Sequence, residues 1–141
     1  MKPTTTQIIL LYGGTAITFL VIDLAWIGMV ARGFYADQIG GMLGDRVNWA
    51  AALIFYGIYV GGIVLFVLIP ALKNGSGTLR VMGMGGLLGL FAYGTFDLSA
   101  LALFKNWPLI VAVVDIAWGS ILTASTAAIS HQIFQRVSTP D

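Results

Sequence analysis

Three carboxylates lie inside stretches of sequence that are otherwise apolar and long enough to cross a membrane: Asp23, Asp97 and Asp115. A charge at the centre of a bilayer costs about 2.5 to 3.5 kcal/mol even on the lenient insertion scale. Such residues therefore mark functional positions by default. A carboxylate at such a position can hold a proton, bind a cation, or act as a general acid or base.

The composition of the chain is that of a membrane protein. Hydrophobic residues make up 58% of the 141 positions and charged residues 9%, and the mean hydropathy is +0.91. The net charge of +1 leaves no polybasic surface, so nucleic acid is not expected as a partner. The chain has no cysteine, which excludes disulfides, iron–sulfur clusters and thiolate metal sites. We expect no cofactor.

Four apolar stretches can be separated at polar positions: residues 8–31, 49–72, 81–104 and 108–130. Each has the roughly 20 helical residues that a bilayer core requires. The pattern predicts a single transmembrane domain over residues 1–141, of the all-α class, folded as an integral membrane four-helix up-down bundle. The longest polar segment runs from Arg32 to Asn48. We expect it to be a connection lying over one mouth of the bundle.

Four spans place both termini on the same side of the membrane. That side has a slight excess of positive charge, which predicts termini in the cytoplasm under the positive-inside rule. Its basic residues are Lys2, Lys73, Arg80 and Arg136, against Arg32, Arg46 and Lys105 on the other side. The lone histidine, His131, falls at the end of the last stretch, where we expect it at the membrane surface.

The alternating direction of the helices brings the three carboxylates to a similar depth. Asp23 and Asp97 lie in the second half of stretches that run away from the termini, whereas Asp115 lies in the first half of a stretch that runs back. Each should sit roughly 10 Å below the face opposite the termini. We expect them to face the bundle interior and one another. The alternative is that each Asp makes one interhelical hydrogen bond and only locks the bundle.

Aromatic residues accompany the carboxylates at helical spacing. The pattern Asp-x-Ala-Trp occurs twice, ending at Trp26 and at Trp118, and it places carboxylate and indole on one helix face. The two indoles could wall a cavity from above and below, or they could be an interfacial belt residue and a packing residue. Tyr93 stands one turn before Asp97 and can join the same polar face.

Small residues on the second and third stretches predict close helix packing, since they let a neighbouring backbone approach. Those of the third stretch are Gly83, Gly85, Gly86, Gly89 and Gly94, and those of the second are Gly57 and Gly61.

Three segments resemble the motifs of a known family: residues 91–99 (FAYGTFDLS), 105–108 (KNWP) and 114–119 (VDIAWG). The family comprises small bacterial inner-membrane proteins catalogued as a domain of unknown function, of the DUF-2177 type. The resemblance covers all four stretches and implies a four-helix integral protein of the bacterial inner membrane. It implies no activity. The residues that it places in the family's motifs are Tyr93, Asp97, Trp107, Pro108, Asp115 and Trp118.

Three functions stay open at this point. The chain could be a carrier or channel that exchanges a proton or cation with a small amphiphilic ligand, and such a protein would need a homodimer or larger complex. It could be an intramembrane lipid-modifying enzyme or a lipid-binding protein, or a non-catalytic accessory subunit of a larger complex. Three acids at one depth favour an ion- or ligand-binding bundle, with transport ahead of catalysis and membrane lipid around it. The candidate site is Asp23, Trp26, Tyr93, Asp97, Asp115 and Trp118.

Overall fold

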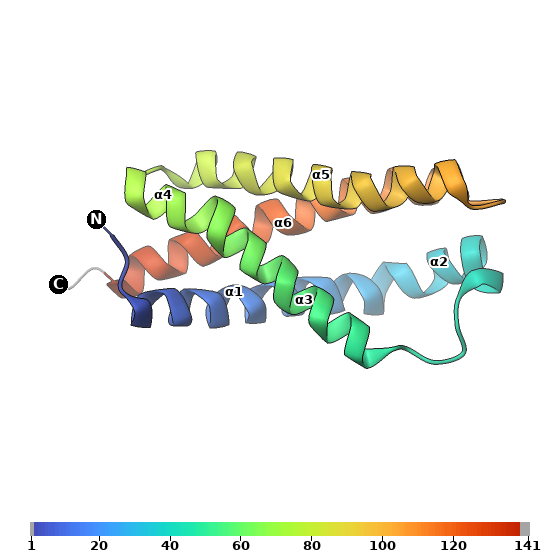
Figure 1. The fold of residues 1–141 in the computed structure, drawn as a ribbon, viewed down its shortest axis with the longest axis horizontal. Helices are drawn as coiled ribbons and strands as arrows, with labels where there is room; N and C mark the ends of the chain where they lie inside the picture. The colour runs from blue at the N-terminus through green and yellow to red at the C-terminus, as the bar shows by residue number, and fades with distance from the viewer. Residues whose placement is uncertain (1, 139–141) are drawn as a thin grey trace.

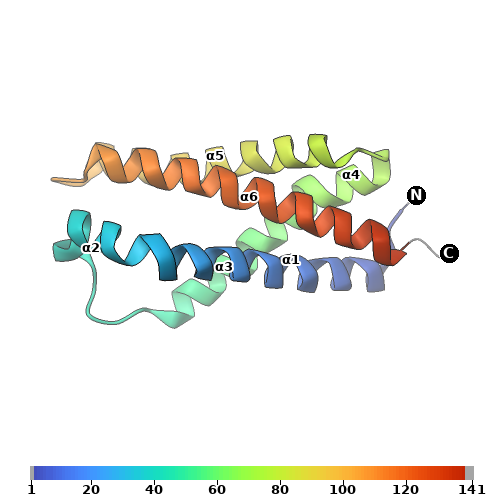
Figure 2. The same cartoon turned by 180° about the vertical axis from the view of Figure 1, so that it is seen from behind.

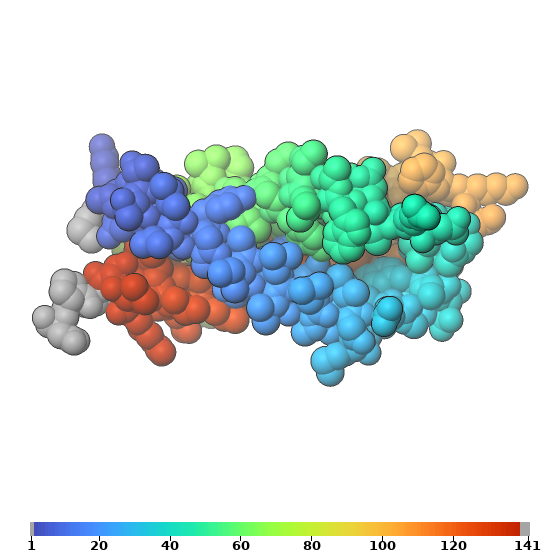
Figure 3. Space-filling view, turned by 90° about the horizontal axis from the view of Figure 1, so that it is seen from below, coloured from blue at the N-terminus to red at the C-terminus, as the bar shows by residue number. Residues whose placement is uncertain are grey.

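The computed structural model describes residues 2–138, which form helices and no strands. Four helical stretches among these residues are long and apolar enough to cross a membrane: Thr5–Met42, Trp49–Asn74, Thr78–Leu103 and Leu109–Ser138. The first residues of α1 and the last described residues of α6 lie at one end of the molecule (Figures 1 and 3). The predicted all-α membrane bundle is therefore confirmed.

The first span is longer than its apolar stretch. Helix α1 (Thr5–Trp26) continues through a π-helical turn (Ile27–Ala31) into α2 (Arg32–Ile39), and a 3-10 turn (Gly40–Met42) ends it. The expected connection from Arg32 is thus mostly helix, because residues 32–39 contain no proline and Gly33 is the one glycine among them. Only residues 43–48 separate this span from the next.

The second span is also interrupted by a π-helical turn. Helix α3 (Trp49–Ile63) begins at Asn48, whose side chain accepts a hydrogen bond from the Ala51 amide at 3.1 Å. The π-helical turn (Val64–Leu68) follows, and then α4 (Ile69–Asn74) carries a proline in its first turn. Gly75, with φ of 61°, terminates α4 in the left-handed conformation that glycine adopts without strain.

The last two spans form an antiparallel hairpin. Helix α5 (Thr78–Leu103) and helix α6 (Leu109–Ser138) are joined by a tight turn that contains Pro108. Trp107 in this turn packs edge-on against Phe96 of α5, with ring centroids 5.9 Å apart. The turn thus holds the end of α5 against the start of α6.

Glycines bring the backbones of α5 and α6 together. A Cβ atom at Gly85 would lie 2.9 Å from the Cβ of Ala127, and one at Gly89 would collide with the backbone of Gly119. A Cβ at Gly83 or Gly94 would meet nothing within 4 Å. The predicted small-residue surface is therefore real but narrower than expected. On α3, Gly57 and Gly61 face the ring of Tyr12 rather than a helix backbone, and the Tyr12 hydroxyl donates to the Gly57 carbonyl at 2.9 Å.

Substitution of these glycines by alanine should distinguish the effect of helix packing on stability from the effect of helix propensity. We expect Gly89→Ala to lower the free energy of unfolding by about 1 to 3 kcal/mol, because the new methyl group has no room against α6. Gly83→Ala should leave stability unchanged or raise it by up to about 1 kcal/mol, because alanine favours helix. Unfolding in mixed micelles, followed by circular dichroism, measures both. Equal effects of the two substitutions would contradict the close approach at Gly89.

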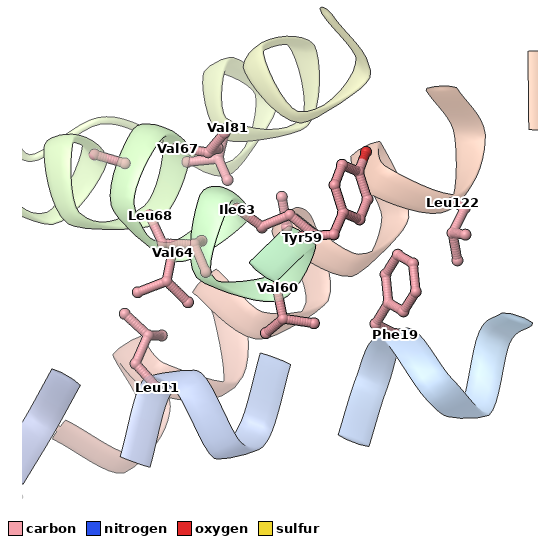
Figure 4. Packing of buried hydrophobic residues seen from close by; sticks show 12 residues of the cluster. Leu11, Phe19, Tyr59, Val60, Ile63, Val64, Val67, Leu68, Val81 and Leu122 are labelled. Atoms are coloured by element: carbon pink, nitrogen blue, oxygen red, sulfur yellow. The ribbon is translucent and has the colours of Figure 1, made fainter. Parts of the chain in front are cut away.

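The apolar core occupies the middle of the bundle and the half nearer the termini. Helix α3 crosses α1 diagonally and approaches α5 only near its far end, where α4 lies beside α5 (Figures 1 and 2). The buried cluster accordingly joins α1, the end of α3 with the π-helical turn and α4, the start of α5, and α6, and Figure 4 shows Leu11, Phe19, Val60, Ile63, Leu68 and Leu122 among its members. The beginnings of α3 and α6 and the end of α5 lie outside this cluster. That half of the bundle holds the carboxylates.

Candidate functional site

The carboxylate of Asp23 connects three spans. It is nine-tenths buried on α1. Its Oδ2 accepts a hydrogen bond from the Tyr56 hydroxyl of α3 at 2.8 Å, and its Oδ1 accepts a longer one from the Trp118 indole of α6 at 3.4 Å. Such bonds hold a carboxylate in place within a low-dielectric interior.

The carboxylate of Asp115 is held by a residue of the first span. Its Oδ1 accepts a hydrogen bond from the Tyr35 hydroxyl at 2.7 Å. Tyr35 lies on α2, in the part of the first span that extends past its apolar stretch. The helical continuation, which the sequence did not predict, thus supplies a hydrogen-bond donor to Asp115. π-Helical turns such as the one preceding α2 often occur at functional positions.

Asp97 has no such support. Its side chain is fully buried on α5, and neither carboxyl oxygen has a hydrogen-bond partner among the described residues. The carboxyl of Asp115, which is half-buried, interacts with it. Two carboxyl groups that interact in a low-dielectric interior repel each other when both are ionised, and a proton or a cation between them removes this repulsion.

The two Asp-x-Ala-Trp motifs meet across antiparallel helices. Trp26 and Trp118 stack face to face, with centroids 4.4 Å apart and an interplanar angle of 9°. The indoles are therefore one layer, not the two separate walls that the sequence suggested. Because each motif's Asp lies three residues from its Trp in the opposite direction, Asp23 and Asp115 are offset along the helix axes by on the order of 9 Å. The structure thus pairs Asp97 with Asp115 and places Asp23 on the other side of the indole stack.

Two adjoining cavities lie beside this stack. The first has a volume of about 200 Å³, and the second, of about 350 Å³, shares Phe55, Tyr93 and Asp115 with it. The first is lined by Asp23, Trp26, Ile27, Ala31, Tyr35, Phe55, Tyr56, Tyr93, Asp115 and Trp118. The second reaches Phe96. Phe55 and Phe96 are 49% and 57% exposed, so the second cavity opens between α3 and α5 toward the surrounding lipid.

Tyr93 lies where the two cavities meet. It lines both cavities together with Asp115, and its ring fills the space left by Gly119, where a Cβ would collide with it. All six predicted site residues therefore lie in this region of the bundle. Five of them line the cavities, and Asp97 is buried behind them against Asp115.

The chemistry of the lining is acidic and aromatic. No lysine, arginine or histidine lines either cavity, and residues 2–138 contain no cluster of three or more side chains that could hold a metal ion. Aromatic faces and carboxylates without a basic partner attract an organic cation. The tyrosine hydroxyls can donate hydrogen bonds to the carboxylates or to a ligand.

Sequence reasoning missed two of the hydrogen-bond donors. Tyr56 is not among the predicted site residues, and Tyr35 falls within the segment that the sequence predicts as a connection. Tyr35 follows Asp23 by twelve residues, and Ile27 and Ala31 lie between them at spacings of four. This spacing marks one helix face, but it is readable only if residues 32–39 are recognised as helix.

The expected surface position of His131 is wrong. Its side chain is 1% exposed, and its Nδ1 lies 3.2 Å from the hydroxyl of Thr78 at the start of α5. The close packing of the α5–α6 hairpin buries it, although it falls near the end of the apolar stretch.

Removing the Tyr35 hydroxyl tests whether this residue orients Asp115. Because the lining attracts an organic cation, we expect Tyr35→Phe to weaken the binding of such a cation about fivefold, since a hydrogen bond to a charged group contributes about 1 kcal/mol or more. Tyr12→Phe removes a tyrosine hydroxyl bond of similar length outside the site and should leave binding unchanged. Calorimetric titration of the two purified variants with the organic cation benzyltrimethylammonium measures their affinities. Equal affinities would show that Tyr35 has no role at Asp115.

Comparison with known families gives a match over residues 8–132 to a model described as a predicted membrane protein, with no activity stated. Neither curated proteins nor solved structures give a match to the chain.

Proposed function

Because the chain belongs to the DUF2177 family of membrane proteins, whose description states no activity, we propose its function from the site alone. The protein binds a small amphiphilic cation at its intramembrane carboxyl groups in exchange for protons, and it serves as a transporter for that cation. The observation that carries the proposal is the acidic, aromatic lining of the two cavities without any basic residue.

Several features of the lining favour a cation with apolar substituents. Rings surround the space on most sides, and they belong to Trp26, Trp118, Tyr35, Tyr56, Tyr93, Phe55 and Phe96. Aromatic faces contribute about 0.5 to 2 kcal/mol each to binding a cation that has lost its water. A hydrated metal ion would gain less from such a lining. The opening between α3 and α5 lets an amphiphile enter from the bilayer.

The carboxyl pair supports exchange with protons. Asp97 and Asp115 need either a proton or a cation to remove their mutual repulsion. When a cation enters, it replaces the proton, and when it leaves, the proton returns. Binding of the two is therefore mutually exclusive, which is the requirement for coupled exchange.

Two further parts of the proposal concern the assembly and the membrane. A single chain presents its opening on one side, between α3 and α5, so we propose that a homodimer forms the two-sided pathway. We place the protein in the bacterial inner membrane with both termini in the cytoplasm. The support for this orientation is the excess of basic residues on the terminal side.

Titration with benzyltrimethylammonium tests the proposal. The purified chain in lipid nanodiscs carries Trp49→Phe and Trp107→Phe, so that fluorescence reports only the stacked pair Trp26 and Trp118. We expect a saturable change in fluorescence together with release of protons. Neopentylbenzene has the same shape without the charge and serves as the control. An equal response to both compounds, or no response to either, would overturn the proposal.

A further inference from the structure

One face of α6 carries buried polar side chains from the acidic site to the end of the bundle near the termini. After Asp115 come Thr123, Thr126, Ser130 and His131, all of them at least 95% buried. Their spacing of three or four residues places the first three in one row along the helix. A membrane helix rarely keeps such a row without a reason, since each buried polar group must find a partner.

Three of these four side chains have a polar atom without a partner among residues 2–138. Thr126 Oγ1, Ser130 Oγ and His131 Nε2 are buried and make no hydrogen bond with any described residue. Buried polar groups left in this state are generally satisfied by ordered water. Side chains three or four residues apart on a helix have Cβ atoms about 5 to 6 Å apart, a gap that one bridging water can close.

The row is connected at both ends. At the inner end, the Thr123 hydroxyl donates to the Gly119 carbonyl at 2.7 Å and lies 2.5 Å from the Tyr59 hydroxyl, which points toward α6 in Figure 4. The ring of Tyr59 packs edge-on against Tyr93 at 6.0 Å, and Tyr93 lines the acidic cavities. At the outer end, His131 contacts Thr78, the half-buried first residue of α5.

We propose that this row is a proton relay between the carboxyl groups and the water on the terminal side of the membrane. The path runs from the acidic site through Tyr93 and Tyr59 to Thr123, Thr126, Ser130 and His131, and it reaches the surface at Thr78. Each hydroxyl or bridging water accepts one proton and passes one on. One proton leaves the carboxyl pair and one enters the surface water, with no other net change. The relay rests on the proposed proton exchange and assigns it a side of the membrane.

Two readouts test the relay. The first needs no ligand: in solid-state NMR, magnetisation should pass from water to the side chains of Thr126 and His131. The second is the rate of proton release after mixing with benzyltrimethylammonium, followed with a pH-sensitive dye. We expect Thr126→Val to slow release by about tenfold or more, with the affinity for the cation changed less than about twofold. Ser130→Ala should act in the same way.

Thr95→Val is the matched control. Thr95 lies near Asp97 on the exposed face of α5 and donates to the Phe91 carbonyl, outside the row. Its loss should not change the rate of proton release. If no magnetisation passes from water to Thr126 and His131, or if protons are released at the unaltered rate in both Thr126→Val and Ser130→Ala, the relay is overturned. Either result leaves the proposed cation site unaffected. Absence of cation binding in the unaltered protein would overturn the proposed function, and the relay's role with it.

Discussion

Asp115→Asn is expected to weaken the binding of benzyltrimethylammonium about 100-fold. The substitution keeps the shape of the side chain and its contact with Tyr35 but removes the charge that faces the ligand. Loss of one partner of a buried charge pair costs about 2 to 5 kcal/mol, and about 2.7 kcal/mol corresponds to a factor of 100. Titration of tryptophan fluorescence measures the change.

Asp37→Asn provides the matched control. Asp37 lies two residues beyond Tyr35 on the exposed face of α2 and lines neither cavity. Its substitution should leave affinity within about twofold of the original value, since an exposed charge near lipid headgroups is screened by solvent. If both variants bind alike, Asp115 does not hold the cation and the site has another ligand.

Asp97→Ala and Asp23→Ala are expected to change stability in opposite directions. Asp23→Ala leaves the Tyr56 hydroxyl and the Trp118 indole without their acceptor, and it should lower the free energy of unfolding by about 2 kcal/mol. Asp97→Ala removes a buried carboxyl group that has no hydrogen-bond donor among residues 2–138 and that interacts with the carboxyl of Asp115. It should leave the free energy of unfolding unchanged or raise it by about 1 kcal/mol.

This comparison also distinguishes a role of Asp97 in ligand binding from a purely structural role. A residue kept for function often lowers the stability of the empty protein, and its removal raises stability while abolishing activity. Unfolding of the ligand-free variants in mixed micelles decides the sign, with Ser99→Ala on the exposed face of α5 as a control for truncation. If Asp97→Ala destabilises the bundle as much as Asp23→Ala does, Asp97 takes part in interhelical hydrogen bonding. Its role is then structural.

The hydropathy of the chain was sufficient to predict its class and the existence of four spans. A backbone inside a bilayer must satisfy its own hydrogen bonds, so long apolar stretches have helix as their available structure. The same reasoning singled out Asp23, Asp97 and Asp115, because the cost of a charge in a membrane does not depend on the details of packing. The glycines of the third stretch also indicated close packing against a neighbouring helix, which the structure identifies as α6.

Local sequence was a poor guide where charge and helix propensity disagreed. Arg32, Asp37 and Gln38 indicated a connection by their polarity, yet nothing between them breaks a helix before Gly40. For this reason Tyr35 was missed as a partner of Asp115. His131 was misplaced for a similar reason, since its burial depends on how near α5 lies and not on its position along α6.

Tertiary structure alone decided how Asp23 lies relative to the other two carboxylates and which side chains complete the site. Rotation and depth of each helix are set by packing against its neighbours, here by the stacked indoles of Trp26 and Trp118 and by the glycine contacts of α5. These contacts separate Asp23 from Asp97 and Asp115 along the helix axes. Helix α3 runs diagonally across the bundle (Figure 1), and the second cavity lies between its Phe55 and the Phe96 of α5. Sequence determined that acids lie in the membrane, because solvation is a property of each residue. Their grouping depends on the distances between residues of different helices, which only the packed bundle defines.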